Sequence, residues 1–130
     1  MPPYDFALFD PPAPVAMVSL RPTNDGDVLT DVPMLIDSGA DLTMVPATRV
    51  DQLKLDIRPE DDFPVEAFDG RRSVARSVKL ELTFLGRTFR GRFLVLDSQS
   101  GILGKNVLNH FTLVLDGPDL SWRAQNNPSR

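Results

Sequence analysis

Apolar and polar residues alternate over several short stretches of the chain, with the period of a β-strand that buries one face. The clearest stretch is 78–84, where Val78, Leu80, Leu82 and Phe84 would point inward between polar neighbours. This pattern predicts a sheet protein with many short strands. Strands are expected at 15–20, 28–36, 65–68, 71–75, 78–84, 88–96, 111–115 and 120–122.

Turn residues separate these runs. Asp25-Gly26 and Asp69-Gly70 are typical of tight connections between antiparallel strands. Short helices are expected only within 46–55 and 105–110, so there is no alternation of strands and helices of the kind that builds a parallel sheet. The predicted class is all-β. One face of 28–36 is expected to be apolar and buried, made of Val28, Thr30, Val32, Met34 and Ile36.

The two ends differ in composition from the middle. Prolines punctuate residues 1–14, which predicts an extended arm resting on the surface through Phe6, Leu8 and Phe9, or alternatively a frayed terminus. Residues 123–130 are expected to form a polar tail. A single folded domain is therefore predicted over 15–122.

Composition narrows the function classes. The chain has 130 residues, 42% of them hydrophobic, which fits one globular domain. A net charge of -4 argues against a nucleic-acid partner. There is no cysteine and one histidine, so no metal or other cofactor is expected. No apolar run reaches the ~18 residues of a membrane helix, and the first residues lack the features of a signal peptide, so we expect a cytoplasmic protein without a membrane partner.

One acidic residue interrupts the apolar pattern abruptly. Asp37 follows the apolar run 33–36 and precedes Ser38 and Gly39. A carboxylate at the exit of a buried strand is costly unless its loop satisfies it, and a glycine lets backbone amides approach. An ordinary Asp-Ser-Gly turn is the simpler interpretation. The apolar pair between two glycines in 101–104 favours the interpretation of Asp37–Gly39 as a functional loop.

The segments 35–40, Leu-Ile-Asp-Ser-Gly-Ala, and 102–108, Ile-Leu-Gly-Lys-Asn-Val-Leu, resemble the two signatures of the retropepsin-like aspartic proteases. These are the single-domain retroviral proteases and their bacterial relatives. The likeness covers about 15–122 in the right order, and the two motifs together are more specific than either alone. It implies a closed β-barrel with a flap hairpin and one or two short helices.

The resemblance implies an aspartic endopeptidase, in which two carboxylates share one proton. This chain has a single Asp-Ser-Gly, so the likeness further implies a homodimer with one Asp37 from each chain. Ser38 would tie the two loops together across the axis, and Gly39 would hold the loop shape. Four residues are expected to support the active loop from below: Ile102, Leu103, Gly104 and Asn106.

The hairpin over 65–75 would be the flap that closes over a bound peptide. Arg71 and Arg72 could favour acidic substrate side chains, although a solvated basic turn is the simpler interpretation. The expected substrate contacts are Ala40, Ala67, Phe68, Asp69, Gly70 and Arg71.

Two other functions remain open at this point. The same fold could serve as a non-catalytic peptide-binding or interaction module, since a fold does not establish a function. An unrelated β-barrel or sandwich would require both motifs to be coincidental. The enzyme is favoured because the acid of Asp37 has no evident structural role.

Overall fold

The computed structural model describes residues 2–23, 26–53, 63–66 and 72–125, with only the backbone described for 63–66 and 72–75. Short strands dominate this part of the chain, which confirms the all-β prediction. The strands are β1 (Val15–Pro22), β2 (Leu29–Ile36), β3 (Met44–Pro46), β4 (Phe63–Glu66), β5 (Arg72–Ala75), β6 (Ser77–Phe84), β7 (Arg87–Leu96), β8 (Gly101–Leu103), β9 (Leu113–Asp116) and β10 (Ser121–Ala124). The helices are α1 (Ala47–Val50), the 3₁₀ turn η1 (Asp51–Leu53) and α2 (Lys105–Leu108).

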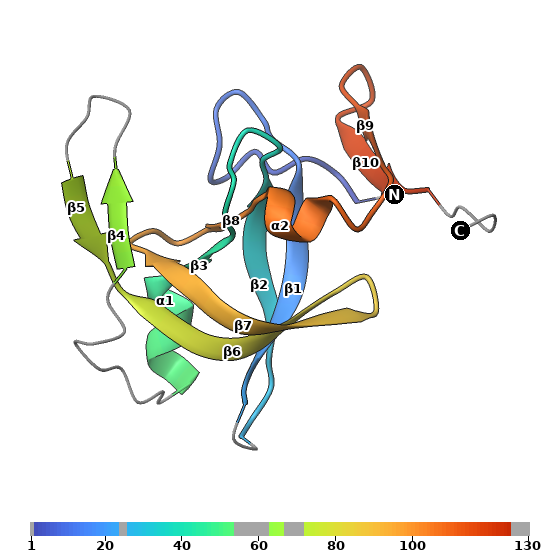
Figure 1. Cartoon of the computed structure of the whole chain (residues 1–130). Coiled ribbons are helices and arrows are strands. Elements are labelled where there is room, and N and C mark those ends of the chain that lie inside the picture. Colours follow the sequence, from blue (N-terminus) through green and yellow to red (C-terminus); the bar gives the residue numbers. More distant parts are fainter. Residues whose placement is uncertain (1, 24–25, 54–62, 67–71, 126–130) are drawn as a thin grey trace.

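Six strands close into a barrel in the order β1-β2-β8-β3-β7-β6 (Figure 1). β1 pairs antiparallel with β2 and with β6, and β6 pairs antiparallel with β7. β2 with β8 and β3 with β7 are parallel pairs. The β4–β5 and β9–β10 pairs are separate two-stranded sheets. The predicted closed barrel is confirmed.

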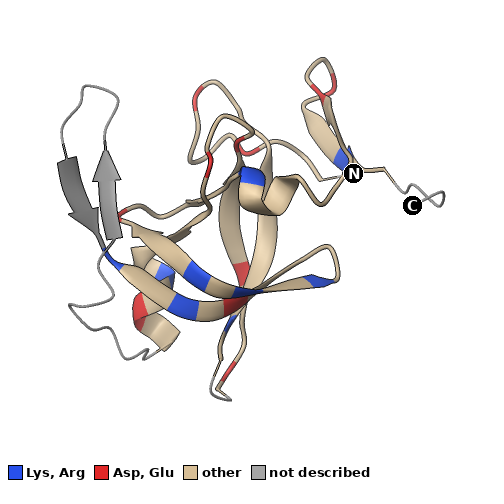
Figure 2. Cartoon of the chain, in the orientation of Figure 1, with Lys and Arg blue, Asp and Glu red and all other residues tan. Residues whose placement is uncertain are grey.

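The barrel interior is filled by the alternating side chains of its strands. In β6, Leu80 and Leu82 are fully buried, whereas Lys79, next to Leu80, and the opposed Arg92 of β7 point outward. Basic residues gather on this outward face of β6 and β7 (Figure 2). The alternation predicted over 78–84 is therefore the packing pattern of the barrel wall.

The start of β2 departs from the expected pattern. Val28 is 53% exposed and Thr30 is exposed, so their predicted place on the buried face is wrong. The cause is a shift in the pairing of β1 with β2 at Asp31, which has φ 57. Such a bulge changes which residues face inward, and here Leu29 packs against the core instead.

The N-terminal arm is held by backbone pairing rather than by the side chains of Phe6 and Leu8, and Phe9 is half-buried. Phe6 is 63% exposed and Leu8 is 41% exposed, so the expected packing through these two side chains is wrong. Instead Tyr4 is buried, and its amide donates a hydrogen bond to the carbonyl of Leu120 at 2.7 Å. The amide of Trp122 donates to the carbonyl of Pro2 at 3.0 Å, so the arm lies along β10.

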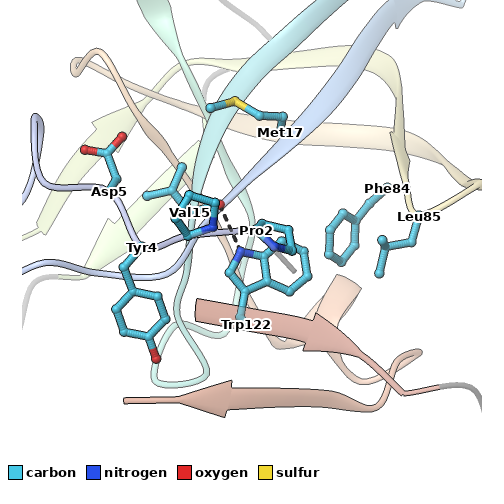
Figure 3. Close-up of a pocket in the computed structure, with 9 residues that line it drawn as sticks. Pro2, Tyr4, Asp5, Val15, Met17, Phe84, Leu85 and Trp122 are labelled. Carbon is cyan, nitrogen blue, oxygen red and sulfur yellow. Dashed lines mark hydrogen bonds between the residues drawn. The ribbon is translucent and has the colours of Figure 1, made fainter. Parts of the chain in front are cut away.

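Trp122 anchors the β9–β10 hairpin to the barrel. Its side chain is 3% exposed, and its indole Nε1 donates to the carbonyl of Val15 at 3.1 Å (Figure 3). Beside it is a mainly apolar cavity of about 390 Å³ that Tyr4, Met17 and Leu85 help to line. β10 extends through Ala124, further along the chain than the predicted strand.

The short helix expected within 46–55 is present as α1 and η1, with Val50 buried and Leu53 half-buried on the barrel side. Leu55 lies outside the described residues, as does the turn at 24–25. No helix in the described part of the chain is long and apolar enough to cross a membrane.

Candidate active site

Asp37 is the first residue after β2, at the start of the loop 37–43 that leads to β3. Ile36 before it is buried, Asp37 is half-buried, and Ser38 and Gly39 are exposed. In Figure 1 this loop lies at the upper end of the barrel, with the β4–β5 pair to its left and the β9–β10 pair to its right. The buried strand thus delivers one carboxylate to an exposed end of the barrel.

The loop itself orients the Asp37 carboxylate. The amide of Gly39 donates a hydrogen bond to Oδ1 of Asp37 at 2.9 Å, and the amide of Ala40 donates to the Asp37 carbonyl at 3.2 Å. A Cβ atom on Gly39 would lie 3.2 Å from the same Oδ1. Glycine therefore leaves room for the amide and the carboxylate to approach.

Strand β8 and the start of α2 support the loop 37–43 from below. Asp37 donates its amide hydrogen to the carbonyl of Leu103 at 3.1 Å, and Leu103 is fully buried. Lys105 donates its amide hydrogen to the carbonyl of Ala40 at 2.8 Å. The two sequence motifs therefore meet in space, because β8 runs parallel to β2 with Leu103 opposite Ile36.

Gly104 is required by close packing of two backbones. A Cβ atom at Gly104 would lie 2.6 Å from both the carbonyl carbon and the carbonyl oxygen of Leu42, and 2.9 Å from the carbonyl oxygen of Ala40. Real Cβ atoms do not approach backbone so closely. The glycine of the second motif thus lets the β8–α2 corner sit directly against the active loop.

Comparison with known protein families identifies the family to which this chain belongs. The sequence model of the family described as aspartyl protease matches residues 22–107, well over half of the chain. The chain belongs to the aspartyl protease family. The matched residues include both motifs, and the family together with the barrel supports aspartic protease function in general.

A solved structure gives the same answer at the level of the fold. The EIAV protease complexed with the inhibitor HBY-793 is 26% identical to this aspartyl protease, with a TM-score of 0.57. The likeness covers 75% of this chain and 86% of that one. No curated protein matches the chain. The predicted retropepsin-like fold is confirmed.

Thr43 is a residue of this site that the sequence analysis did not single out. It is 1% exposed and lies just before β3 of the aspartyl protease barrel. Its Oγ1 accepts a hydrogen bond from the amide of Gly104 at 3.0 Å and donates one to Oδ1 of Asn106 at 2.7 Å. The available signal was a single hydroxyl within the otherwise apolar run 42–45.

An ion pair lies at the outer edge of the loop. Nζ of Lys105 is 3.3 Å from Oδ1 of Asp41, and the amide of Asn106 donates to the Asp41 carbonyl at 3.3 Å. Both charged side chains are well exposed, so the pair contributes at most about 1 kcal/mol to stability. The backbone contacts, rather than this pair, fix the loop.

The two strands of the predicted flap are present in the aspartyl protease as β4 and β5. They are antiparallel, with Phe63 opposite Ala75 and Glu66 opposite Arg72. Ala40 is half-buried in the active loop. Five of the predicted substrate contacts lie outside the described residues: Ala67, Phe68, Asp69, Gly70 and Arg71.

In the described parts of the chain, no three histidine, cysteine, aspartate or glutamate side chains gather as metal ligands would. The sequence holds one Asp-Ser-Gly, at 37–39. This sequence therefore supplies one carboxylate of this kind.

Proposed function

We propose that this chain is an aspartic endopeptidase that works as a homodimer, with Asp37 of each chain facing the other across a two-fold axis. The observation that carries the proposal is the Asp37 carboxylate, oriented by the Gly39 amide and held at an exposed end of the barrel by Leu103. Among the described residues, the Asp37 carboxylate forms no ion pair that would give it a purely structural role.

The chemistry follows from two carboxylates close together. Like charges about 3 Å apart do not both ionise, so the pair holds one proton. The ionised carboxylate takes a proton from water, whose oxygen attacks the peptide carbonyl, while the protonated one donates to the carbonyl oxygen. The tetrahedral intermediate then breaks its C–N bond, and the nitrogen leaves with a proton returned from the dyad.

The exposed residues of the loop support a contact with a second copy. Ser38 and Gly39 are exposed at the end of the barrel, next to Asp37. A two-fold axis beside this loop brings the same three residues of both chains together, since a two-fold interface is self-complementary. Ser38 would then hydrogen-bond across the axis and lock the two carboxylates in place.

The β9–β10 hairpin supports the same assembly. Within the described residues β9 pairs only with β10, so its other edge is open. Leu115 of β9 is 51% exposed and Leu120 is 37% exposed. An open edge with apolar side chains is prone to pair with another chain. We propose that the second copy of this protein covers it.

The proposed substrate is an extended peptide. Such a peptide would lie between the Asp37 loops and the β4–β5 pairs, bonded through its main chain in the manner of an added strand. Closure of the hairpin would exclude water other than the attacking molecule. The residues 67–71 and Ala40 remain our predicted substrate contacts.

The test is cleavage of a peptide library by the full chain from about pH 3 to about pH 8, with products identified by mass spectrometry. We expect cleavage on the acid side with a bell-shaped pH profile, because one carboxylate must be protonated and the other ionised. Asp37→Asn should abolish peptide cleavage. Asp97→Asn, which changes an exposed aspartate after β7, should leave cleavage unchanged. Peptide binding without cleavage by the wild type would favour the interaction module instead.

A further inference from the structure

We infer that Thr43 is a positioning residue of the proposed protease, whose hydroxyl sets the orientation of Asp37 through the second motif. The inference rests on the proposed function for its kinetic consequence, but its structural part does not. It concerns the side chain that joins the active loop to the β8–α2 corner.

The Thr43 hydroxyl uses both of its hydrogen-bonding roles. Oγ1 accepts from the Gly104 amide at 3.0 Å and donates to Oδ1 of Asn106 at 2.7 Å. At 1% exposure, water has no access to replace either bond. A hydroxyl is the smallest group that both accepts and donates, so no apolar side chain of the same shape can take its place.

The residues that Thr43 bonds, Gly104 and Asn106, are chain neighbours of the residues that hold the active loop. Gly104 follows Leu103, whose carbonyl accepts the amide hydrogen of Asp37. Lys105 donates its amide hydrogen to the carbonyl of Ala40. The path from the Thr43 hydroxyl to the Asp37 backbone therefore runs through adjacent residues and short hydrogen bonds.

Packing holds this corner on either side of Gly104, where Leu103 and Val107 are buried in the core, but it supplies no polar partner at Gly104 itself. Gly104 has no side chain to wedge it in place, although its backbone lies against Leu42 and Ala40. The surface ion pair of Lys105 with Asp41 is exposed and weak. The hydroxyl of Thr43 is thus a buried side-chain contact that ties the corner to the loop, beside the backbone hydrogen bonds of Leu103 and Lys105.

The first test compares Thr43→Val with Thr43→Ser in the full chain. Valine keeps the shape but leaves the Gly104 amide and the Asn106 side chain without their partner, whereas serine keeps the hydroxyl. We expect kcat to fall about 10- to 100-fold in Thr43→Val, as for a misplaced catalytic group. KM should change less than about threefold, because Thr43 does not contact the peptide. Thr43→Ser should restore most of kcat.

Thr83→Val is the matched control. Thr83 also shares a hydroxyl hydrogen bond, at 2.9 Å to Thr88, but on the exposed outer face of the barrel. The same substitution there should leave kcat unchanged. Equal losses of kcat in Thr83→Val and Thr43→Val would show a general effect of the substitution and would overturn the inference.

A second readout does not depend on catalysis. Amide hydrogen exchange of Thr43→Val should speed up about tenfold or more at Gly104, Gly39 and Ala40, while the amides of β6 and β7 keep their protection. If the wild type cleaves no peptide, the proposed function fails, and this exchange pattern still decides whether Thr43 holds the loop. Unchanged exchange at Gly39 and Ala40 would overturn the inference.

Asn106→Ala keeps the inference testable if Thr43→Val does not fold. Asn106 is largely exposed, so its loss should not prevent folding. It removes the acceptor of the Thr43 hydroxyl, and we expect the same direction of change in kcat and in exchange at Gly39. If both variants fold, their combined effect should be smaller than the product of the single effects, because they remove one connected chain of bonds.

Discussion

The Asp37 loop and the β9–β10 hairpin lie at the same end of the barrel but are built in different ways. The loop is fixed from below: Leu103, Gly104 and Lys105 each make a backbone contact with residues 37–43. The hairpin is hydrogen-bonded to the rest of the chain along β10, by Trp122 and the N-terminal arm, and among the described residues β9 has an open edge.

The difference separates two requirements of the proposed enzyme. A catalytic carboxylate must be held within a fraction of an ångström, which a single chain achieves with internal bonds. Dimerisation instead needs an exposed apolar surface that a single chain leaves uncovered. In the proposed dimer, each loop would supply one of the two catalytic carboxylates, and each hairpin would supply part of a sheet shared by the two chains.

The largest effect should come from the loop. Asp37→Asn should lower kcat/KM by at least about 10³-fold, because an amide can act neither as the base nor as the acid. Fold and dimer should remain, since the Gly39 amide can still donate to the Asn oxygen. Peptide cleavage and circular dichroism check this. Activity within about tenfold of wild type would mean that another residue carries the reaction.

Stability should be most sensitive where the two motifs touch. Gly104→Ala places a Cβ atom 2.6 Å from the backbone of Leu42 and should lower the free energy of unfolding by about 1–3 kcal/mol. Gly91→Ala is the control, because a Cβ atom there meets nothing within 4 Å. It should be neutral or stabilising by up to about 1 kcal/mol. Urea denaturation of both variants measures the contrast, and equal values would contradict the close approach.

The hairpin should govern assembly rather than folding. Leu115→Asp puts a charge on the open strand and should weaken dimerisation by about tenfold or more, since an unpaired charge at an interface is costly. Val28→Asp is the control, because Val28 is similarly exposed, at 53%, just before β2. Sedimentation at several concentrations compares the two. A dimer that is unaffected by Leu115→Asp would remove β9 from the interface.

A loss of stability like that of Gly104→Ala is expected at the anchor of the hairpin. Trp122→Phe removes the bond from the indole to the Val15 carbonyl and part of the buried ring. The free energy of unfolding should fall by about 1–3 kcal/mol, from an unsatisfied carbonyl and lost packing. Thermal unfolding measures it. No change would mean that the arm and Tyr4 hold the hairpin without the indole.

Much of the fold was predictable because local patterns carry it. The alternation of 78–84 and the Asp-Ser-Gly at 37–39 gave a barrel strand and the acidic loop, and the structure has both. The pairing shift at Asp31 was not predictable, because it depends on the register between β1 and β2. The sequence pattern predicted that Phe6, Leu8 and Phe9 hold the arm, whereas the aromatic residue that is buried is Tyr4, next to the backbone bonds of the arm to Leu120 and Trp122.

The candidate site was predictable only in part. The second motif lies under the first, yet the bond that joins them through Thr43 depends on contacts between residues 61 positions apart. A single hydroxyl in an apolar run does not reveal its partners. The roles of Ser38, Ala40 and residues 67–71 stay predictions for the assays above.

The most direct test of the shared dyad is an activity titration of mixed chains. Wild type and Asp37→Asn are mixed at fixed total concentration, allowed to exchange subunits, and assayed for peptide cleavage. If each site needs one Asp37 from each chain, activity falls with the square of the wild-type fraction, to about one quarter in an equal mixture. A linear fall, to about one half in that mixture, would mean that each chain acts with its own residues and would contradict the account.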